Sequence, residues 1–217
     1  MKISIVGKLD GIRSWSLPAG KACPGSKMAD GSVSPVCQGC YAQCGNYRFK
    51  NVKASREHNM KDWKRKGWVK DMVAELQTDK FFRWFHSGDC YCEQLAAKIL
   101  SVMGQTPRCK HWMSTRMYKI PGVKVWLDAM NQLPNVKVRF SADSLDGSHV
   151  TGLHSAIVLA PGAKKPRHVT LCGAYKNVQA KCNGCRKCWN KDVFVIGYPA
   201  HGQRMQGVVT RMKQHSS

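Results

Sequence analysis

The sequence predicts an α/β protein whose core is either a partial (βα) barrel or an open, mostly parallel sheet. Segments with the two-residue hydrophobic period of strands alternate along the chain with segments of helical period. A complete eightfold barrel typically needs ~250 residues, whereas this chain has 217. The length therefore favours an incomplete barrel or an open sheet, with cysteine-rich loops attached.

The N-terminal part begins with a short expected strand and continues into an irregular region. KISIVG at residues 2–7 is typical of a strand, and residues 11–45 are so rich in Gly, Ser, Pro and Cys that we expect a long loop. Residues 51–78 carry helix-forming residues, with large apolar side chains at four-residue intervals from Trp68 to Leu76. This spacing predicts helices with one buried face.

Strands and helices then alternate through the middle of the chain. We expect helices at 92–104 and 123–133 and strands at 81–89, 109–116, 135–144, 156–161 and 168–172. The turns HSGD, STR and SADS end three of these segments, and functional groups gather at the carboxyl ends of parallel strands. Polar side chains such as Arg116 and Asp143 therefore either line one pocket with Asp89 or cap the following helices.

We expect one compact domain over residues 1–217, because its 43% hydrophobic residues are spread along the length. Its expected parts are an N-terminal strand and cysteine-rich loop at 1–50, a βα core at 51–160 and a C-terminal cysteine-rich lobe at 161–217. No run approaches the ~18 apolar residues of a membrane span, and the N-terminus lacks a signal-peptide core. The sequence predicts a cytoplasmic protein without membrane contact.

The strongest metal-binding pattern lies near the C-terminus and comprises Cys172, Cys182, Cys185 and Cys188. In a reducing cytoplasm, clustered thiols are more often metal ligands than disulfides. The C-x2-C-x2-C spacing matches the start of a ferredoxin-type run, whereas zinc ribbons usually present two separate C-x2-C pairs. We therefore expect an iron-sulfur cluster, of the [4Fe-4S] type, with structural zinc as the alternative.

A second cysteine group occupies the N-terminal loop and comprises Cys23, Cys37, Cys40 and Cys44. The loop has almost no hydrophobic periodicity that would order it, so a second iron-sulfur cluster is the favoured explanation. Four cysteine ligands would close such a cluster, whereas three would leave one iron open to a substrate. Whether Cys44 is a ligand is left open by the spacing.

The chain is strongly basic, with 35 Lys and Arg against 13 Asp and Glu and a net charge of +22. Such a field favours a polyanionic partner, which we expect to be nucleic acid, without distinguishing DNA from RNA. Nine Lys or Arg residues lie between Arg48 and Lys70, interleaved with Phe49, Trp63 and Trp68 as expected stacking groups. The alternative is a solvated helix face. The expected nucleic-acid contacts are Arg48, Lys50, Lys53, Lys64, Arg65 and Lys66.

The first cysteine group resembles that of radical S-adenosylmethionine enzymes. These carry C-x3-C-x2-C with an aromatic residue beside the last cysteine, and a Gly-Gly-Glu type turn after the next strand. Here the corresponding residues are Cys23, Cys37, Cys40 and Tyr41, and then Ser87-Gly88-Asp89, with thirteen residues in place of three in the first spacing. The resemblance implies a [4Fe-4S] cluster on the three cysteines and S-adenosylmethionine bound by the SGD turn.

A broader resemblance is to the bacteriophage family called gene product 88. It is carried by CPGS and C-x2-C-Y-A, by RWFHSGD, and by KCNGCRKCW, which together span residues 23–188. The resemblance implies a phage protein acting in the cytoplasm of an infected bacterium, with a radical-enzyme-like core and a C-terminal cysteine site. It implies no particular reaction.

Three hypotheses follow from the sequence. The first is an iron-sulfur protein whose basic surface binds nucleic acid. The second is a radical S-adenosylmethionine enzyme that modifies a nucleic acid or a protein. The third is a zinc-stapled module that binds a host protein. Whether the chain is an enzyme stays undecided, and no catalytic residue is assigned.

Overall fold

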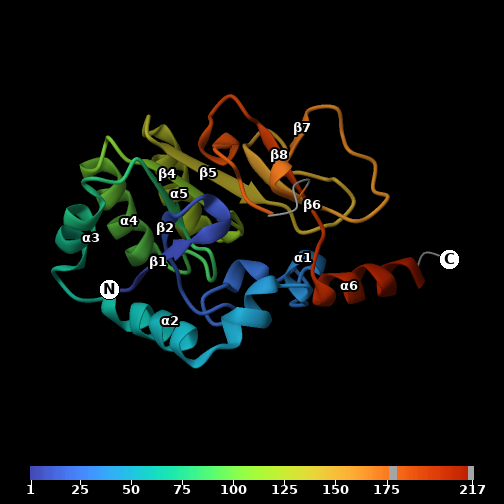
Figure 1. Cartoon of the computed structure of the whole chain (residues 1–217), viewed down its shortest axis with the longest axis horizontal. Coiled ribbons are helices and arrows are strands. Elements are labelled where there is room, and N and C mark those ends of the chain that lie inside the picture. Colours follow the sequence, from blue (N-terminus) through green and yellow to red (C-terminus); the bar gives the residue numbers. More distant parts are fainter. Residues whose placement is uncertain (176–179, 215–217) are drawn as a thin grey trace.

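The computed structural model describes residues 1–175 and 180–214, so part of the expected C-terminal lobe at 161–217 lies outside the described residues. An eight-stranded sheet with strand order β1-β2-β3-β4-β5-β6-β8-β7 forms the centre of the molecule (Figure 1). The strands are β1 Ile3–Val6, β2 Ile12–Trp15, β3 Phe81–Trp84, β4 Lys110–Thr115, β5 Val136–Ser141, β6 Ser155–Leu159, β7 Val169–Leu171 and β8 Val195–Pro199.

Every strand pair is parallel except β1 with β2, so the expected mixed α/β fold with a mostly parallel sheet is confirmed. The strands β2 to β6 lie side by side in chain order. In the described residues, β1 and β7 are the two ends of this order and do not pair with each other. Closure into a barrel therefore remains a prediction.

Three long helices cover one face of the sheet: α3 Trp68–Leu76, α4 Glu93–Gln105 and α5 Pro121–Gln132. The expected buried stripe of α3 is confirmed, since its large apolar side chains are completely buried from Trp68 to Leu76. They pack with side chains such as Trp84 and Phe140, which alternate strand positions direct toward the helices. This helix face holds the largest hydrophobic core.

The opposite face of the sheet carries polar and charged side chains beside a smaller apolar cluster that contains Trp112 and Trp189. Register places Ser14 of β2, Arg83 of β3 and Trp112 of β4 in one row, with Ser114 and Arg139 paired one step further along β4 and β5. We call these five residues the polar face. The C-terminal cysteine loop covers the part of this face around Trp112, whose ring lies 5.0 Å from that of Trp189.

The expectation of one long loop over residues 11–45 was wrong at two places. Residues 12–15 form strand β2, and Pro35–Gln38 form a short helix, α1. The remaining helices are α2, Lys50–Asp62, and α6, Gln203–Gln214, which extends beside α1 (Figure 1). The strand β8 and the helix α6 were not expected from the sequence.

Candidate metal centre

The four cysteines of the C-terminal group come together in the structure. Cys172 directly follows β7, and the other three lie on the loop that leads to β8. All four line one small cavity, with Leu171 and Ile196 among its other walls. Burial raises the pKa of the Cys188 thiol to about 11. A bound metal would offset this cost, because metal coordination deprotonates a thiol.

The C-terminal cysteine loop is hydrogen-bonded to the turn between β1 and β2. The Asp10 carboxylate accepts hydrogen bonds from the backbone N–H of Asn183 at 3.1 Å and of Gly184 at 2.9 Å. The guanidinium of Arg186 also donates to it, at 2.8 Å, and the Cys182 N–H donates to the Lys8 carbonyl. The N-terminal hairpin therefore positions the C-x2-C-x2-C loop from more than 170 residues away in the chain.

Arg139 holds the other end of this loop onto the sheet. Its guanidinium is completely buried and donates only to backbone carbonyl oxygens, those of Lys187, Cys188, Asn190, Val193 and Phe194. The Tyr198 hydroxyl lies 3.3 Å from the Cys188 thiol. These contacts fix the position of the last cysteine before β8.

The N-terminal group lies on the segment between β2 and α2, with Cys37 in α1. Burial, and next the neighbouring Asp89, raise the pKa of the Cys23 thiol to about 12, with smaller contributions from Cys40 and Cys37. These three thiols are therefore electrostatic neighbours. The Cys44 thiol points to the Cys40 carbonyl oxygen, with 3.9 Å between sulfur and oxygen. Among residues 1–175 and 180–214, no three Cys, His, Asp or Glu side chains are placed to hold one metal ion.

The C-terminal helix supports this first group. The Arg204 guanidinium donates to the Gln38 carbonyl at 2.9 Å. A Cβ atom on Gly39 would lie 2.5 Å from the terminal methyl carbon of Met205, so the helix approaches the cysteine loop where only glycine fits. Each cysteine group is thus held by the opposite end of the chain.

The SGD turn is hydrogen-bonded to Leu17, just after β2. The Leu17 N–H donates to the Ser87 carbonyl at 3.0 Å, and the Ser87 hydroxyl donates to the Leu17 carbonyl at 2.8 Å. Gly88 has a φ of +73°, and a Cβ there would lie 2.6 Å from the Cβ of Leu17. The predicted residues Ser87 and Gly88 therefore hold the turn close to the cysteine loop.

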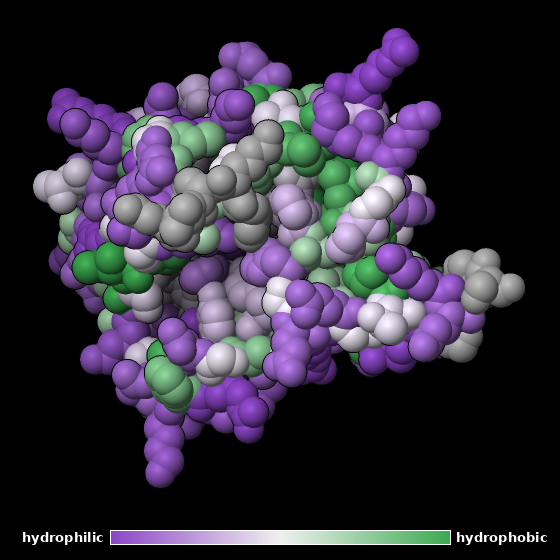
Figure 2. Space-filling view, turned by 45° about the vertical axis from the view of Figure 1, so that its right-hand side comes forward, coloured by the Kyte–Doolittle hydropathy of each residue, from purple (hydrophilic) through white to green (hydrophobic). Residues whose placement is uncertain are grey.

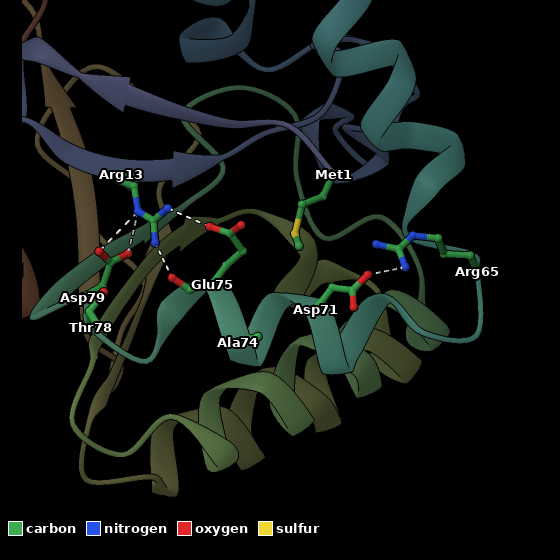
Figure 3. Close-up of a pocket in the computed structure, with 8 residues that line it drawn as sticks. All are labelled: Met1, Arg13, Arg65, Asp71, Ala74, Glu75, Thr78 and Asp79. Atoms are coloured by element: carbon green, nitrogen blue, oxygen red, sulfur yellow. Dashed lines mark hydrogen bonds and ion pairs between the residues drawn. The ribbon is translucent and has the colours of Figure 1, made fainter.

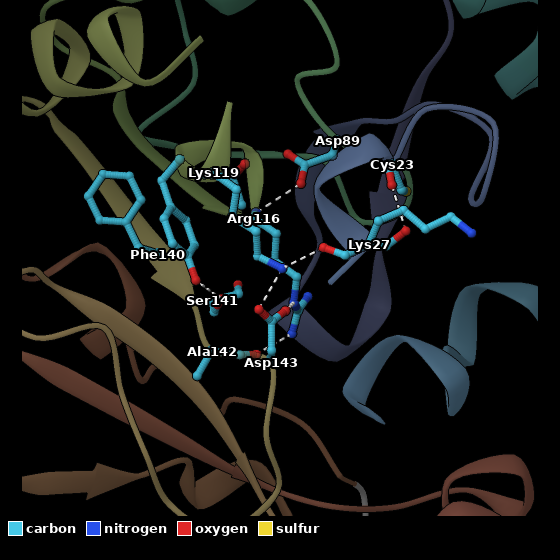
Figure 4. Close-up of polar contacts among 12 residues, drawn as sticks. Cys23, Lys27, Asp89, Arg116, Lys119, Phe140, Ser141, Ala142 and Asp143 are labelled. Carbon is cyan, nitrogen blue, oxygen red and sulfur yellow. Dashed lines mark hydrogen bonds and ion pairs between the residues drawn. The ribbon is translucent and has the colours of Figure 1, made fainter. Parts of the chain in front are cut away.

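Asp89 joins the turns that follow three neighbouring strands (Figure 4). Its carboxylate, only 7% exposed, accepts the backbone N–H of Arg116 at 3.0 Å. The Arg116 side chain in turn reaches Asp143 at 3.2 Å, as does Lys119 at 2.5 Å. The SGD, STR and SADS turns therefore lie together, and these side chains pair with one another. Burial raises the pKa of Asp89.

The aromatic residue after Cys40 also contacts the turn after β3. The Tyr41 hydroxyl donates to the His86 carbonyl at 2.8 Å, and the Tyr47 hydroxyl lies 2.9 Å from Nε2 of His86. Burial, and then the charges of Arg83 and Arg56, lower the pKa of His86 to about 2. His86 is therefore neutral and serves as a hydrogen-bonding partner of the cysteine loop.

The basic residues expected to bind nucleic acid lie on the surface around α2. Arg48, Lys50, Lys53, Lys64, Arg65 and Lys66 are all exposed. Arg65 is paired with Asp62 at 2.8 Å and with Asp71 at 2.5 Å, so its charge is partly compensated. The interpretation of Trp63 and Trp68 as stacking groups was wrong, because both are buried in the core. Phe49 is 58% exposed and can stack.

A broad surface cavity lies elsewhere, between β2 and α3 (Figure 3). Its charged side chains are already paired. Arg13 bonds to Glu75 and Asp79, and Arg65 bonds to Asp71. It contains no cysteine, so we place the functional site at the carboxyl ends of the strands instead.

These features define an α/β protein in which two cysteine groups border one mostly parallel sheet. A family model described as gene product 88 matches residues 3–191, and the chain belongs to that family. The matched span contains both cysteine groups and Asp10. No curated protein and no solved structure gives a significant match. Within the described residues, no helix is long and apolar enough to cross a membrane.

Proposed function

We propose that this chain is an iron-sulfur protein with two clusters and a basic surface that binds nucleic acid in an infected bacterium. The observation that carries the proposal is the cavity lined by Cys172, Cys182, Cys185 and Cys188. These thiols come from two separate segments of the chain and lie beside the sheet. Contacts from Asp10 and Arg139 hold the loop that carries three of them. Their number and chemistry fit a [4Fe-4S] cluster, and their spacing favours it over zinc.

The chain's own residues have defined tasks in this proposal. Cys23, Cys37 and Cys40 would hold the second cluster, with Cys44 as a fourth ligand or a bystander. A bound cluster supplies one-electron transfer and, at an iron without a cysteine, a site for S-adenosylmethionine. Asp10 and Arg139 position the C-terminal thiols by holding their loop. Absorption and paramagnetic resonance spectra of the anaerobically purified, reduced protein test this, and zinc without acid-labile sulfide would overturn it.

Nucleic-acid binding is supported by the exposed basic residues around α2. Lys50, Lys53 and Lys64 point to solvent and form no ion pair within the described part of the chain, and Phe49 is exposed beside them. Phosphate contacts weaken as salt rises, because each releases condensed counterions. Binding to a generic oligonucleotide should therefore be tight at low salt and fall steeply as salt is added. No detectable binding even near ~50 mM salt would overturn this part.

Radical S-adenosylmethionine chemistry on a nucleic acid or protein is the second candidate. It is favoured by the proximity of Cys23 and Asp89 at the ends of the neighbouring parallel strands β2 and β3. Asp89 would meet the amino group of the methionine moiety, as the SGD turn suggests. The test is release of 5′-deoxyadenosine from S-adenosylmethionine by the reduced protein. A Cys40→Ala variant is the matched control and should release none.

A further inference from the structure

The polar face contains hydrogen-bonding atoms without partners. Within the described residues, the buried atoms that lack a hydrogen-bond partner include Oγ of Ser14, Nε of Arg83, Nε1 of Trp112 and Oγ of Ser114. The first three residues form one row across β2, β3 and β4, and Ser114 follows Trp112 on the same face. A buried polar atom without a partner costs ~1–3 kcal/mol, so four neighbours in this state call for a common explanation.

The charge of Arg83 is also left without a carboxylate in the described part of the chain. Its guanidinium lies over the Trp112 ring at 4.5 Å and reaches the Tyr41 hydroxyl only at 3.5 Å. Its other near neighbours are the Tyr198 and Tyr47 hydroxyls, which are neutral at neutral pH, and the Cys188 thiol, which is one of the proposed cluster ligands. A guanidinium with an unpartnered N–H and no carboxylate beside it in the described residues suits an anionic acceptor.

We propose that the polar face is a binding site for a phosphate group, with Arg83 and Trp112 as principal donors and Ser14 and Ser114 beside them. The Arg Nε–H and the Trp Nε1–H can only donate, so the missing partner must accept hydrogen bonds. A phosphate has several acceptor oxygens and matches the planar fork of a guanidinium. Figure 2 shows that the face that carries α6 is largely hydrophilic, as the basic composition leads one to expect.

The site lies between the two cysteine groups, yet it does not depend on the clusters. Tyr41, which Arg83 approaches, follows Cys40, and the Cys188 thiol is the neighbour on the other side. A phosphorylated ligand bound here would therefore contact both loops. Because Arg83, Trp112 and the two serines belong to the sheet, phosphate binding can fail while cluster binding succeeds, and the reverse.

The test is calorimetric titration of the anaerobically purified protein with inorganic phosphate and with adenosine 5′-monophosphate, at matched ionic strength. Arg83→Lys keeps the positive charge but loses the planar, paired N–H donors of the guanidinium. It should weaken phosphate binding about ten- to a hundredfold. Trp112→Phe loses one N–H and should weaken it about two- to tenfold. Trp68→Phe is the matched control, because its Nε1 is also buried without a partner but lies on the helix face. It should leave binding unchanged.

Ser14→Ala keeps the test decisive if the arginine variant fails to fold. Removing an unpartnered buried hydroxyl should leave the thermal midpoint unchanged or raised in the absence of phosphate, while phosphate binding weakens. Tighter binding of the mononucleotide would assign the phosphate to a nucleotide, and equal binding would assign it to the free anion. No saturable binding of either probe, or binding that Arg83→Lys and Ser14→Ala leave unchanged, would overturn the proposal.

Discussion

Replacing Arg139 by lysine should strongly destabilise the C-terminal cysteine loop. Lysine keeps the positive charge, but one ammonium cannot reach the five carbonyl oxygens that the guanidinium bonds at 2.8 to 3.3 Å. Most of these carbonyls would lose their partner in a position that is completely buried from solvent. The fold should therefore lose stability, and the loop that carries Cys188 should become less ordered.

The size of this effect follows from the number of bonds lost. A hydrogen bond to a charged group contributes ~1.5–3 kcal/mol. The total loss is smaller than the sum over five bonds, because some of the carbonyl oxygens would bind water instead. Removing one partner of a buried network typically costs ~3–5 kcal/mol. We therefore expect Arg139→Lys to lower the free energy of unfolding by about 3–5 kcal/mol, a large share of the ~5–15 kcal/mol typical of a domain.

Urea unfolding followed by tryptophan fluorescence measures this change. Arg211→Lys is the matched control, because Arg211 is exposed on α6 and its replacement should change the free energy by less than ~0.5 kcal/mol. A loss below ~1 kcal/mol for Arg139→Lys would refute the structural role given to its five hydrogen bonds.

Three further predictions concern other parts of the molecule. Gly88→Ala should lower the free energy of unfolding by about 1–3 kcal/mol, because φ is +73° and the new Cβ would meet Leu17; a thermal midpoint equal to that of the wild type would contradict this. His111 is buried, accepts from the Trp84 N–H and has its pKa lowered by burial to about 4, so stability should fall as pH drops below ~6.5. Its unfolded form takes up the proton first, and His111→Gln should show a weaker fall between pH 7 and pH 5 in urea titrations. Replacing Lys50, Lys53 and Lys64 by glutamate should weaken oligonucleotide binding and reduce the salt slope by about one unit per lysine contact. Arg65→Gln, whose charge is already paired, should change the slope less.

The periodic core of the fold could be predicted from the sequence. Helix α3 follows from the spacing of Trp68, Met72 and Leu76, and the strands that precede the SGD, STR and SADS turns follow from their apolar residues. These signals are local, because each depends on a few neighbouring side chains. The meeting of the three turns was predictable as well, since parallel strands bring their carboxyl ends to one edge.

Features that depend on distant contacts could not be predicted in this way. Strand β2 is only four residues long and lies in a Gly- and Ser-rich region, so its pairing with β1 and β3 decides its structure. Asp10 and Arg139 bond to the C-terminal loop across large separations in the chain. Trp63 resembled a surface stacking group among lysines, but its N–H bonds to Tyr91 and its ring is buried.

The cysteine groups are the clearest sequence signal, and the four C-terminal cysteines line one cavity, although no three ligands among the described residues are placed to hold one metal ion. Within each group, burial raises the pKa of thiols such as Cys23 and Cys188, an unfavourable arrangement for bare thiolates that metal binding would relieve.

Iron and acid-labile sulfide content of the anaerobically purified protein tests the central claim most directly, measured beside a Cys182→Ser, Cys185→Ser double variant. Two [4Fe-4S] clusters predict about eight iron and eight sulfide per wild-type chain, and about four of each in the variant. Zinc without sulfide in the wild type, or iron content that the double variant leaves unchanged, would contradict the claim that the C-terminal cysteines bind a cluster.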